Sequence, residues 1–326
     1  MRSVVYTKVS TLDALQVEER EMPSIREDEV LVEVRASALN NSDTMKFLED
    51  SKGKIPTKTH IMMAVTGAVG KAAGAEVSGI VEKVGKSVTH FKAGDEVYAS
   101  LGTTGAWSEY VAVKESVLCL KPKNLSFEEA AAIPVSGITA LGAVRKANIE
   151  PGQQVLVYGA SGGVGHYAVQ LAKAQGAIVT AVCSTRNIEM AHTIGADFVI
   201  DYTTQNFANQ GKTYDAIIAV NGYNPLGVYT KALNDGGTYV VLGGMKQAMS
   251  GILGPIRSIG SSKKLTFFIY ASSDGQESLI YLKKLAEAGE LKPYIDKSFS
   301  VWEAGDAIKY AIDNHAHGKI SLTFDS

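Results

Sequence analysis

The sequence predicts an α/β protein that combines a doubly wound parallel sheet with a smaller, strand-rich domain. Over the first 120 residues, many short apolar segments occur without a strong helical repeat, which is typical of a compact β-barrel. From about residue 124, apolar strands alternate with helical segments, which is the pattern of a parallel sheet. Within that part, residues 155–183 read as strand, glycine-rich turn, helix and strand, the beginning of a βαβ unit.

The strand-rich domain contains an alternating segment at residues 29–36. There Val30, Val32 and Val34 fall on one face, as in a strand with one buried side. Further strands are expected in residues 74–85, 91–98 and 107–113, whereas residues 48–74 are irregular and receive no assignment.

The second part begins with a capping box, in which Ser126 caps a helix and Glu129 reaches back to the cap. Apolar strands are expected at residues 155–158, 178–183, 198–200, 214–220, 237–244 and 264–270. Helices are expected after the glycine-rich turn and at residues 189–195, 226–233, 275–289 and 302–314, with a last strand at 319–324.

The glycine-rich turn, residues 159–165, has the composition needed to hold a pyrophosphate. Gly162 lacks a Cβ, so a phosphate can approach the backbone, and Gly165 lets the helix pack closely on the strand. The helix N-terminus offers N–H groups and a partial positive charge. A glycine pattern alone is weak, but the strand before it and the helix after it are both predicted, as the motif requires. The expected dinucleotide-binding residues are Ala160, Ser161, Gly162, Gly163, Val164 and Gly165.

These residues resemble the nucleotide-binding signature of the medium-chain dehydrogenase/reductase superfamily, in its zinc-free quinone oxidoreductase (zeta-crystallin-like) branch. Residues 74–85, 91–97 and 318–322 are similar to segments of that family's catalytic domain. The resemblance implies a Rossmann sheet and a GroES-like β-barrel catalytic domain that takes back the C-terminal end of the chain. The expected domains are residues 1–123, the GroES-like part; 124–272, the Rossmann cofactor domain; and 273–326, the return to the first domain.

Composition and charge exclude several classes of partner. Lys plus Arg (32) nearly balances Asp plus Glu (34), so neither nucleic acid nor an anionic membrane is expected. No segment is apolar enough to span a membrane, and no signal peptide is recognisable, so a cytoplasmic location is expected. The two cysteines, Cys119 and Cys183, cannot build a disulfide framework and read as small buried residues.

The family resemblance also bears on metal binding. Asn40 stands where zinc-dependent relatives carry a cysteine ligand, and Ala75 stands where they carry a histidine. The close pair His315 and His317 reads as a solvated helix end rather than a metal site. No catalytic metal is therefore expected. Without such a Lewis acid, an already electrophilic acceptor, a quinone or an α,β-unsaturated carbonyl, is the favoured substrate.

Asn40 and Asp43 match the Asn-x-x-Asp of the zinc-free branch and are the candidate catalytic residues. The resemblance implies that the Asn40 amide touches substrate or nicotinamide; the alternative is a helix-capping turn, which fits Asp43 better. Met45 stands where many relatives carry a tyrosine or lysine, so the proton donor is open and water is one candidate.

The residues that follow the second strand of the βαβ unit indicate whether the cofactor is NADH or NADPH. Ser184 occupies the position where NAD enzymes carry an acidic residue, and Arg186 could pair with a 2′-phosphate, unless it is a solvated loop arginine. Tyr202 resembles a family residue that assists there. NADPH is thus the expected cofactor. Asn221, Gly243 and Gly244 end later strands on the side where such sheets bind ligands.

The preferred function is an NADPH-dependent, zinc-independent reductase of quinones or enones. One alternative is a non-enzymatic NADPH-binding redox sensor or structural protein; another is an enoyl-thioester reductase, which would need a larger basic groove. Residues 264–270 are apolar on both faces, and such a strand at a sheet edge favours pairing with a second copy. A homodimer is therefore expected.

Overall fold

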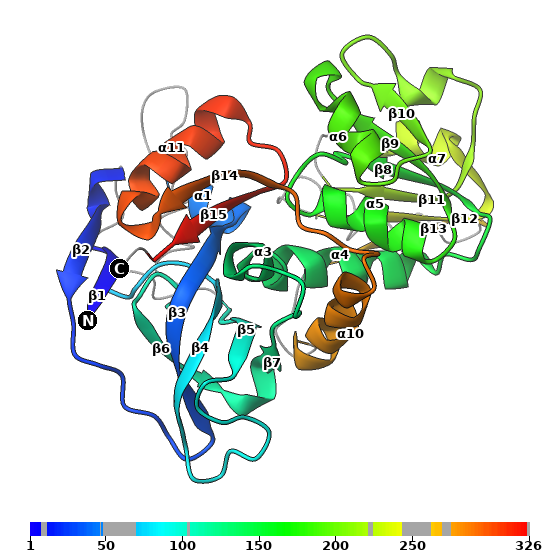
Figure 1. Cartoon of the computed structure of the whole chain (residues 1–326). Coiled ribbons are helices and arrows are strands. Elements are labelled where there is room, and N and C mark those ends of the chain that lie inside the picture. The colour runs from blue at the N-terminus through cyan, green and yellow to red at the C-terminus, as the bar shows by residue number, and fades with distance from the viewer. Residues whose placement is uncertain are drawn as a thin grey trace. The chain divides into compact units, whose positions relative to one another are not determined.

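The computed structural model describes residues 1–7, 12–45, 47, 70–102, 105–220, 224–242, 262–268 and 275–324 (Figure 1). The chain forms two compact units. The first comprises Met1–Val135, Ser272–Glu287 and Pro293–Ser326, and the second comprises Ser136–Ala271 and Ala288–Lys292.

The first unit is built on a seven-stranded sheet. Its strands are β3 (Glu29–Leu39), β4 (Glu76–Val84), β5 (Glu96–Ser100), β6 (Tyr110–Lys114), β7 (Leu118–Leu120), β14 (Ile295–Ser300) and β15 (Lys319–Thr323). Their order is β14-β15-β3-β4-β5-β7, with β6 pairing with β3, and a separate hairpin joins β1 (Arg2–Tyr6) to β2 (Leu15–Glu19). The strand-rich character predicted for this part is confirmed.

Strand β3 organises this sheet because it pairs with β4, β6 and β15. Val30, Val32 and Val34 are almost fully buried, which confirms the face predicted from their alternation. Strand β15 runs antiparallel to β3, with Ile320 opposite Leu39. The beginning of β15 therefore lies beside the end of β3, directly before Asn40.

Helices and short 3-10 turns complete the first unit. They are α1 (Asn41–Thr44), α3 (Phe127–Ala131), α10 (Gly275–Glu287) and α11 (Ala304–Asn314), with 3-10 turns at Leu12–Ala14, Glu115–Val117 and Val301–Glu303. The capping box of α3 is confirmed, since Ser126 Oγ accepts from Glu129 N at 3.2 Å and Glu129 Oε2 accepts from Ser126 N at 3.0 Å.

The first unit extends past the boundary expected at residue 123, because α3 packs on its sheet. Ser78 Oγ on β4 donates to Phe127 O at 2.6 Å. Helix α3 ends early, and a second helix, α4 (Pro134–Ala147), begins at a proline, whose fixed φ suits the first helical position. The sequence had not separated these two helices.

The second unit is a six-stranded sheet in which every pairing is parallel. Its strands are β8 (Gln154–Tyr158), β9 (Ile178–Cys183), β10 (Phe198–Asp201), β11 (Tyr214–Ala219), β12 (Leu233–Val241) and β13 (Lys264–Phe267). Its helices are α5 (Gly165–Ala174), α6 (Ile188–Thr193), α7 (Leu226–Lys231) and most of α4, with 3-10 turns at Thr185–Asn187 and Phe207–Asn209. Helices α5 and α6 pack on β8, β9 and β10 (Figure 1).

The strand order, β10-β9-β8-β11-β12-β13, confirms the predicted doubly wound sheet. From β8 the chain builds outward through β9 and β10, then returns to β11 on the other side and builds outward again. The order thus reverses between β8 and β11. Sheets of this kind bind ligands at such a switch point, beyond the carboxyl ends of the strands. The glycine-rich turn follows β8 at this end of the sheet.

Candidate functional site

The glycine-rich turn leads directly from β8 into α5, which begins at Gly165. Gly159 has φ +80°, a conformation that side chains with a Cβ rarely adopt. A Cβ on Gly165 would lie 2.0 Å from the carbonyl oxygen of Gly159 and 2.9 Å from Ala160 Cα. The helix therefore approaches the turn as closely as the sequence predicted.

The expected dinucleotide-binding residues of this turn differ in exposure. Ala160 and Gly165 are buried, whereas residues 161–164 are partly exposed at the N-terminal end of α5. Buried His166 turns its Nδ1 to Gly162 O at 3.1 Å, which requires the proton on Nδ1 in the neutral ring. The turn thus presents backbone at the N-terminus of a ten-residue helix, an arrangement that fits a pyrophosphate.

A buried asparagine that the sequence analysis missed joins this turn to the loop after β9. Asn187 is 5% exposed, and its Nδ2 donates to Ser161 Oγ at 2.8 Å and to Ser184 Oγ at 3.2 Å. Two of the expected cofactor residues are therefore held by one side chain. Arg186, also expected, is exposed within the 3-10 turn of the same loop. An asparagine among polar loop residues carries little signal in the sequence, because it reads equally well as a turn residue.

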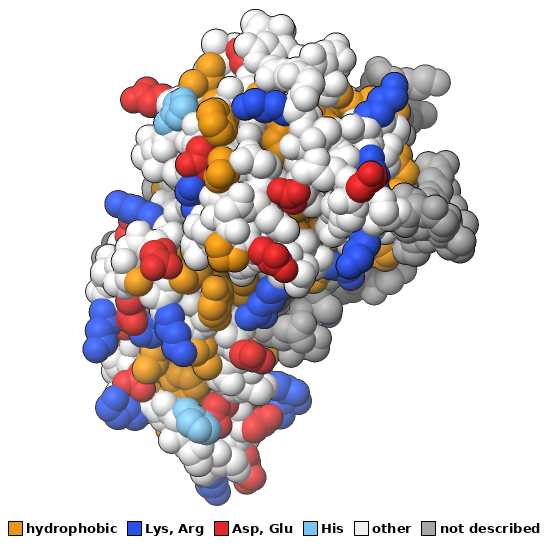
Figure 2. All heavy atoms as spheres, turned by 90° about the vertical axis from the view of Figure 1, so that its right-hand side faces the viewer, with side chains coloured by type: hydrophobic (Ala, Val, Ile, Leu, Met, Phe, Trp, Pro, Cys, Tyr) orange, Lys and Arg blue, Asp and Glu red, His pale blue; other side chains and the backbone are white. Residues whose placement is uncertain are grey.

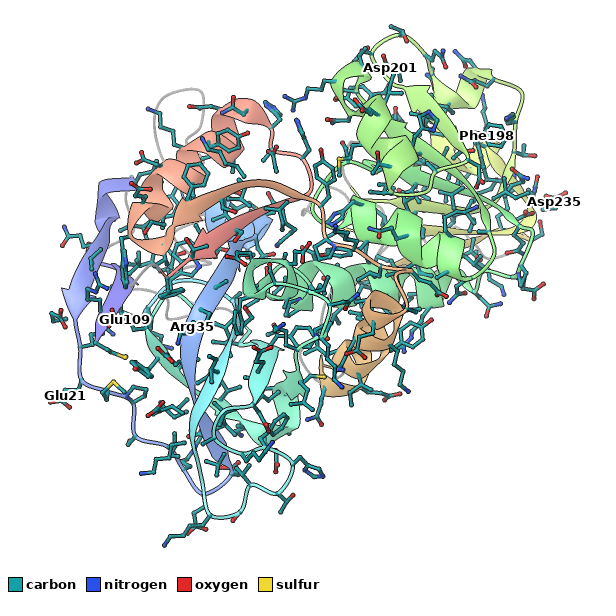
Figure 3. The ribbon with its side chains drawn as sticks, viewed as in Figure 1. Glu21, Arg35, Glu109, Phe198, Asp201 and Asp235 are labelled. Atoms are coloured by element: carbon teal, nitrogen blue, oxygen red, sulfur yellow. The ribbon has the colours of Figure 1, made fainter. Side chains whose placement is uncertain are left out.

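A second missed residue, Asp201, brings a carboxylate to the same loop. It ends β10 (Figure 3), where the parallel register places it opposite Cys183 at the end of β9. Its carboxylate accepts from Thr185 Oγ1 at 2.5 Å and from Thr203 N and Oγ1 at 2.9 and 2.7 Å. These hydrogen bonds from Thr185 and Thr203 lower the pKa of Asp201. The carboxylate is thus engaged by the loop itself, and the expected Tyr202 beside it is 53% exposed.

The candidate catalytic residues lie in the first unit, at the junction of β3 and α1. Asn40 is 7% exposed and caps α1; Asp43 is fully buried, and its Oδ2 accepts from Asn40 N at 3.0 Å. Burial, with the charge and hydrogen bond of Asp43, raises the pKa of Tyr6 well above its usual value. Asp43 thus makes a helix-capping contact, which is the alternative role expected for it.

The Asn40 side chain belongs to a buried polar cluster with Lys319 and Glu76. Asn40 Oδ1 accepts from Lys319 Nζ at 2.7 Å, and Asn40 Nδ2 donates to Glu76 Oε1 at 2.8 Å. Lys319 Nζ and Glu76 Oε1 form an ion pair at 2.8 Å, with side chains 2% and 0% exposed. Neither partner was predicted from the sequence. Their only signal is a charged residue inside an otherwise apolar strand segment.

The residues of this cluster do not fit a catalytic zinc. Ala75 has no donor atom, and the ammonium of Lys319 lies beside Asn40, where it would repel a divalent cation. Across the described ranges, no three His, Cys, Asp or Glu side chains are grouped to hold a metal. Burial raises the pKa of both Cys119 and Cys183 to about 11, which disfavours their thiolates as ligands.

Other expected features fall on residues that the structure does not describe. These are the cofactor-side residues Asn221, Gly243 and Gly244, and most of the irregular segment 48–74. Of the helices that are described, none has the length and apolarity needed to cross a membrane. On the face shown in Figure 2, acidic and basic side chains are interspersed among the described residues, as the near-zero net charge leads one to expect.

Two family models match the chain: an alcohol dehydrogenase GroES-like domain over residues 26–123 and a zinc-binding dehydrogenase over residues 194–322. A 2-methylene-furan-3-one reductase of Solanum lycopersicum is 35% identical, over 99% of this chain and 79% of that protein. An NADPH-dependent alkenal/one oxidoreductase of Arabidopsis thaliana is 32% identical, over 98% and 78%. A quinone-oxidoreductase of Triphysaria versicolor is 33% identical, over 92% and 91%.

The fold is shared with solved structures. A quinone oxidoreductase from Coxiella burnetii superposes with a TM-score of 0.86 over 100% of this chain and 99% of that chain, at 24% identity.

The contact of Gly165 with the turn gives a prediction. Gly165→Ala forces its methyl group into the Gly159 carbonyl, so we expect a loss of about 1–3 kcal/mol of stability, together with weaker dinucleotide binding. Gly227→Ala, in α7 with open space around its Cβ, is the matched control and should be neutral or stabilising by up to about 1 kcal/mol. Thermal unfolding and dinucleotide titration measure both effects. Equal melting temperatures for Gly165→Ala and the wild type would contradict the proposed close packing.

Proposed function

The chain belongs to the medium-chain dehydrogenase/reductase superfamily, in its quinone oxidoreductase branch, and on that premise we propose that it reduces quinones or α,β-unsaturated carbonyl compounds with NADPH and without a catalytic metal. It is an oxidoreductase of a family that uses nicotinamide dinucleotides. The names of the relatives support both acceptor classes, since they specify a 2-methylene-furan-3-one reductase, an alkenal/one oxidoreductase and a quinone-oxidoreductase.

The observation that carries this proposal is the cluster around Asn40. A carbonyl–alcohol interconversion needs a strong polariser on the carbonyl oxygen, which metal-dependent dehydrogenases supply as a Lewis acid. Here the corresponding place holds an asparagine amide fixed by an ammonium and a carboxylate. An amide N–H can orient a carbonyl oxygen but polarises it weakly. An enone or a quinone needs less polarisation, because its accepting carbon is already electrophilic.

Each proposed cofactor residue would hold a particular group of the dinucleotide. When bound, the nicotinamide supplies the hydride. The turn and the N-terminus of α5 would hold the pyrophosphate, and Ser184 and Arg186 would hold the 2′-phosphate. Three hydrogen-bond donors occupy the carboxylate of Asp201. The carboxylate therefore competes less with the 2′-phosphate for Arg186, and fewer of its lone pairs are left for a ribose hydroxyl. This arrangement supports NADPH over NADH.

The reductase function is tested by acceptor-dependent oxidation of NADPH. We expect turnover with p-benzoquinone or methyl vinyl ketone, no turnover with the saturated analogue butanone, and no loss of rate after metal chelation. Crotonyl-coenzyme A serves as the probe for enoyl-thioester reduction. NADPH binding without oxidation by any acceptor would instead support a non-enzymatic redox sensor or structural protein, and turnover restricted to crotonyl-coenzyme A would support the thioester reductase.

Cofactor choice gives a second prediction. A charge-assisted contact contributes about 1.5–3 kcal/mol, so Arg186→Ala should weaken NADPH binding by about one to two powers of ten and leave NADH nearly unchanged. Ser184→Asp should weaken NADPH and strengthen NADH, because it repels the phosphate and offers the ribose an acceptor. Arg145→Ala, an exposed arginine at the end of α4, is the control and should change neither.

The measurement is the Kd of each dinucleotide for each variant at fixed, low ionic strength, since salt screens exposed ion pairs. Equal wild-type affinities for NADH and NADPH would contradict the proposed specificity. If Arg186→Ala still prefers NADPH over NADH, the preference is assigned to Ser184 and Tyr202 instead.

We further propose a homodimer formed through β13, the last strand in the order of the described part of the second unit's sheet. Of the apolar side chains expected on the two faces of this segment, Phe268 packs on α4, since a Cβ on Gly142 would lie 2.0 Å from its ring. Ile269 and Tyr270 lie outside the described residues. Among the described strands of this sheet β13 is the outermost, and an outermost strand is suited to continuing a sheet into a second copy.

Sedimentation at micromolar concentration should therefore give a dimer. Thr266→Lys, which places a charge on the partly exposed middle of β13, should shift the equilibrium towards monomer. A monomeric wild type would contradict the proposed dimer. A dimer that persists unchanged in Thr266→Lys would place the interface elsewhere.

A further inference from the structure

The ion pair between Lys319 and Glu76 is buried to a degree that stability alone does not explain. Among the ion pairs of the described ranges, it is the one with both side chains less than 5% exposed. Removing two charges from water is costly, and apolar side chains of similar volume often stabilise a protein equally well or better. A pair of this kind in a small polar cluster therefore calls for a second role.

Every polar atom of the pair has a partner. The three N–H groups of the Lys319 ammonium match three acceptors: Leu39 O at 2.9 Å, Asn40 Oδ1 at 2.7 Å and Glu76 Oε1 at 2.8 Å. Glu76 Oε1 also accepts from Asn40 Nδ2, and Glu76 Oε2 accepts from Val135 N at 2.7 Å. The cluster is thus fully connected, and Asn40 is the member that touches both charges.

The two charges give the Asn40 amide a single orientation. Its oxygen faces the ammonium and its nitrogen faces the carboxylate. A flipped amide would direct its N–H groups at the ammonium and its oxygen at the carboxylate, so both contacts would become repulsive. The ammonium also polarises the amide carbonyl, which strengthens the amide N–H groups as donors.

We propose that Lys319 and Glu76 are positioning residues of the hydride-transfer site, which hold the Asn40 amide in the one orientation in which it meets the acceptor. This inference rests on the proposed reductase function. It also gives the last strand of the chain a role in the site, because Lys319 is separated from Asn40 by 279 residues and from Glu76 by 243.

The test removes both charges together, because either single substitution would leave the other charge buried and unpaired. In the double variant Lys319→Met/Glu76→Gln we expect a folded protein with unchanged Kd for NADPH, since the residues proposed to bind the phosphates belong to the second unit. We expect kcat for the acceptor to fall by about tenfold or more, with a smaller change in KM, because orientation matters most in the transition state. An unchanged kcat would overturn the proposal.

A thermodynamic cycle shows whether the pair acts through Asn40. Asn40→Ala alone should lower kcat by at least as much as the double variant, and the triple variant should lose no more than Asn40→Ala. Losses that multiply would mean that the charges act independently of Asn40 and would overturn the positioning role.

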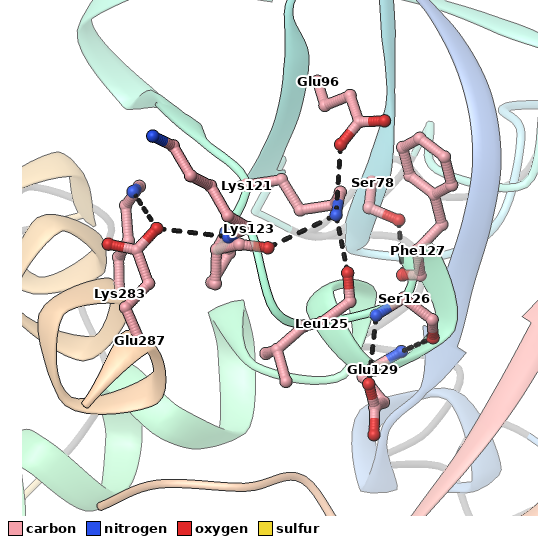
Figure 4. A network of polar contacts seen from close by, with 11 residues as sticks. Ser78, Glu96, Lys121, Lys123, Leu125, Ser126, Phe127, Glu129, Lys283 and Glu287 are labelled. Carbon is pink, nitrogen blue, oxygen red and sulfur yellow. Dashed lines mark hydrogen bonds and ion pairs between the residues drawn. The ribbon is translucent and has the colours of Figure 1, made fainter. Parts of the chain in front are cut away.

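A second buried lysine provides the matched control. Lys121 lies in the same unit, donates to Leu125 O at 2.6 Å and pairs with Glu96 at 3.1 Å (Figure 4). It touches none of the residues around Asn40 that carry the proposal. Lys121→Met should lower the melting temperature and leave kcat and KM unchanged, which separates general destabilisation from a loss of positioning. A fall in kcat equal to that of the double variant would show that the effect is not specific to the cluster.

A spectroscopic readout separates this proposal from the proposed function. The Asn40 side-chain amide is identified in a proton–nitrogen correlation spectrum by its loss in Asn40→Ala. Its two protons should have well-separated shifts and slow exchange in the wild type, and both properties should diminish in the double variant. If no acceptor is reduced, the proposed function fails while this spectrum still decides whether the pair orients Asn40. An amide signal unchanged by the double substitution would overturn the inference by itself.

Discussion

The buried ion pair between Lys319 and Glu76 is the interaction on which the arrangement of the candidate site in the first unit depends. It joins the last strand, β15, to β4, and through Leu39 and Asn40 it also joins both to the end of β3. Two charges can be buried there only because each polar atom has a partner, so the strands must meet in one register. The strand register that pairs the two charges also places Asn40 and fixes the orientation of its side-chain amide. The position of the candidate site therefore depends on the same register as the sheet itself.

The second unit depends on a different constraint, the close approach of α5 to the turn after β8. Gly165 makes that approach possible, and the reversal of strand order between β8 and β11 places the turn where ligands bind to such sheets. Hydrogen bonds then shape the neighbouring loop. Asn187 holds Ser161 and Ser184 together, and Asp201 holds Thr185. The centre of the candidate cofactor surface is thus held by side-chain hydrogen bonds, and exposed residues such as Arg186 lie at its edge.

Features encoded by short stretches of chain could be predicted from the sequence. The alternation of Val30, Val32 and Val34, the capping box at Ser126 and the strand–turn–helix around Gly165 each depend on neighbouring residues, and all three are present in the structure. The division between α3 and α4 was missed, because a run of alanines continues a helical pattern up to Pro134.

The polar contacts between distant strands could not be predicted. Lys319 meets Asn40 because β15 pairs with β3, and Asp201 meets Thr185 because β10 lies in register beside β9. Neither pairing is visible in local composition. For the same reason, the sequence identifies Asn40 as a candidate without its partners. It also does not reveal that β10 brings the carboxylate of Asp201 to the loop after β9.

We propose that the chain delivers hydride from NADPH to an activated alkene without a metal. This proposal is tested most directly with metal-stripped protein, methyl vinyl ketone and NADPH that carries deuterium on the hydride-donating face of the nicotinamide. We expect saturated ketone with deuterium at the carbon β to the carbonyl, formed at the same rate with and without added zinc. Deuterium at the carbonyl carbon of an alcohol product, or transfer that appears only when zinc is restored, would contradict it.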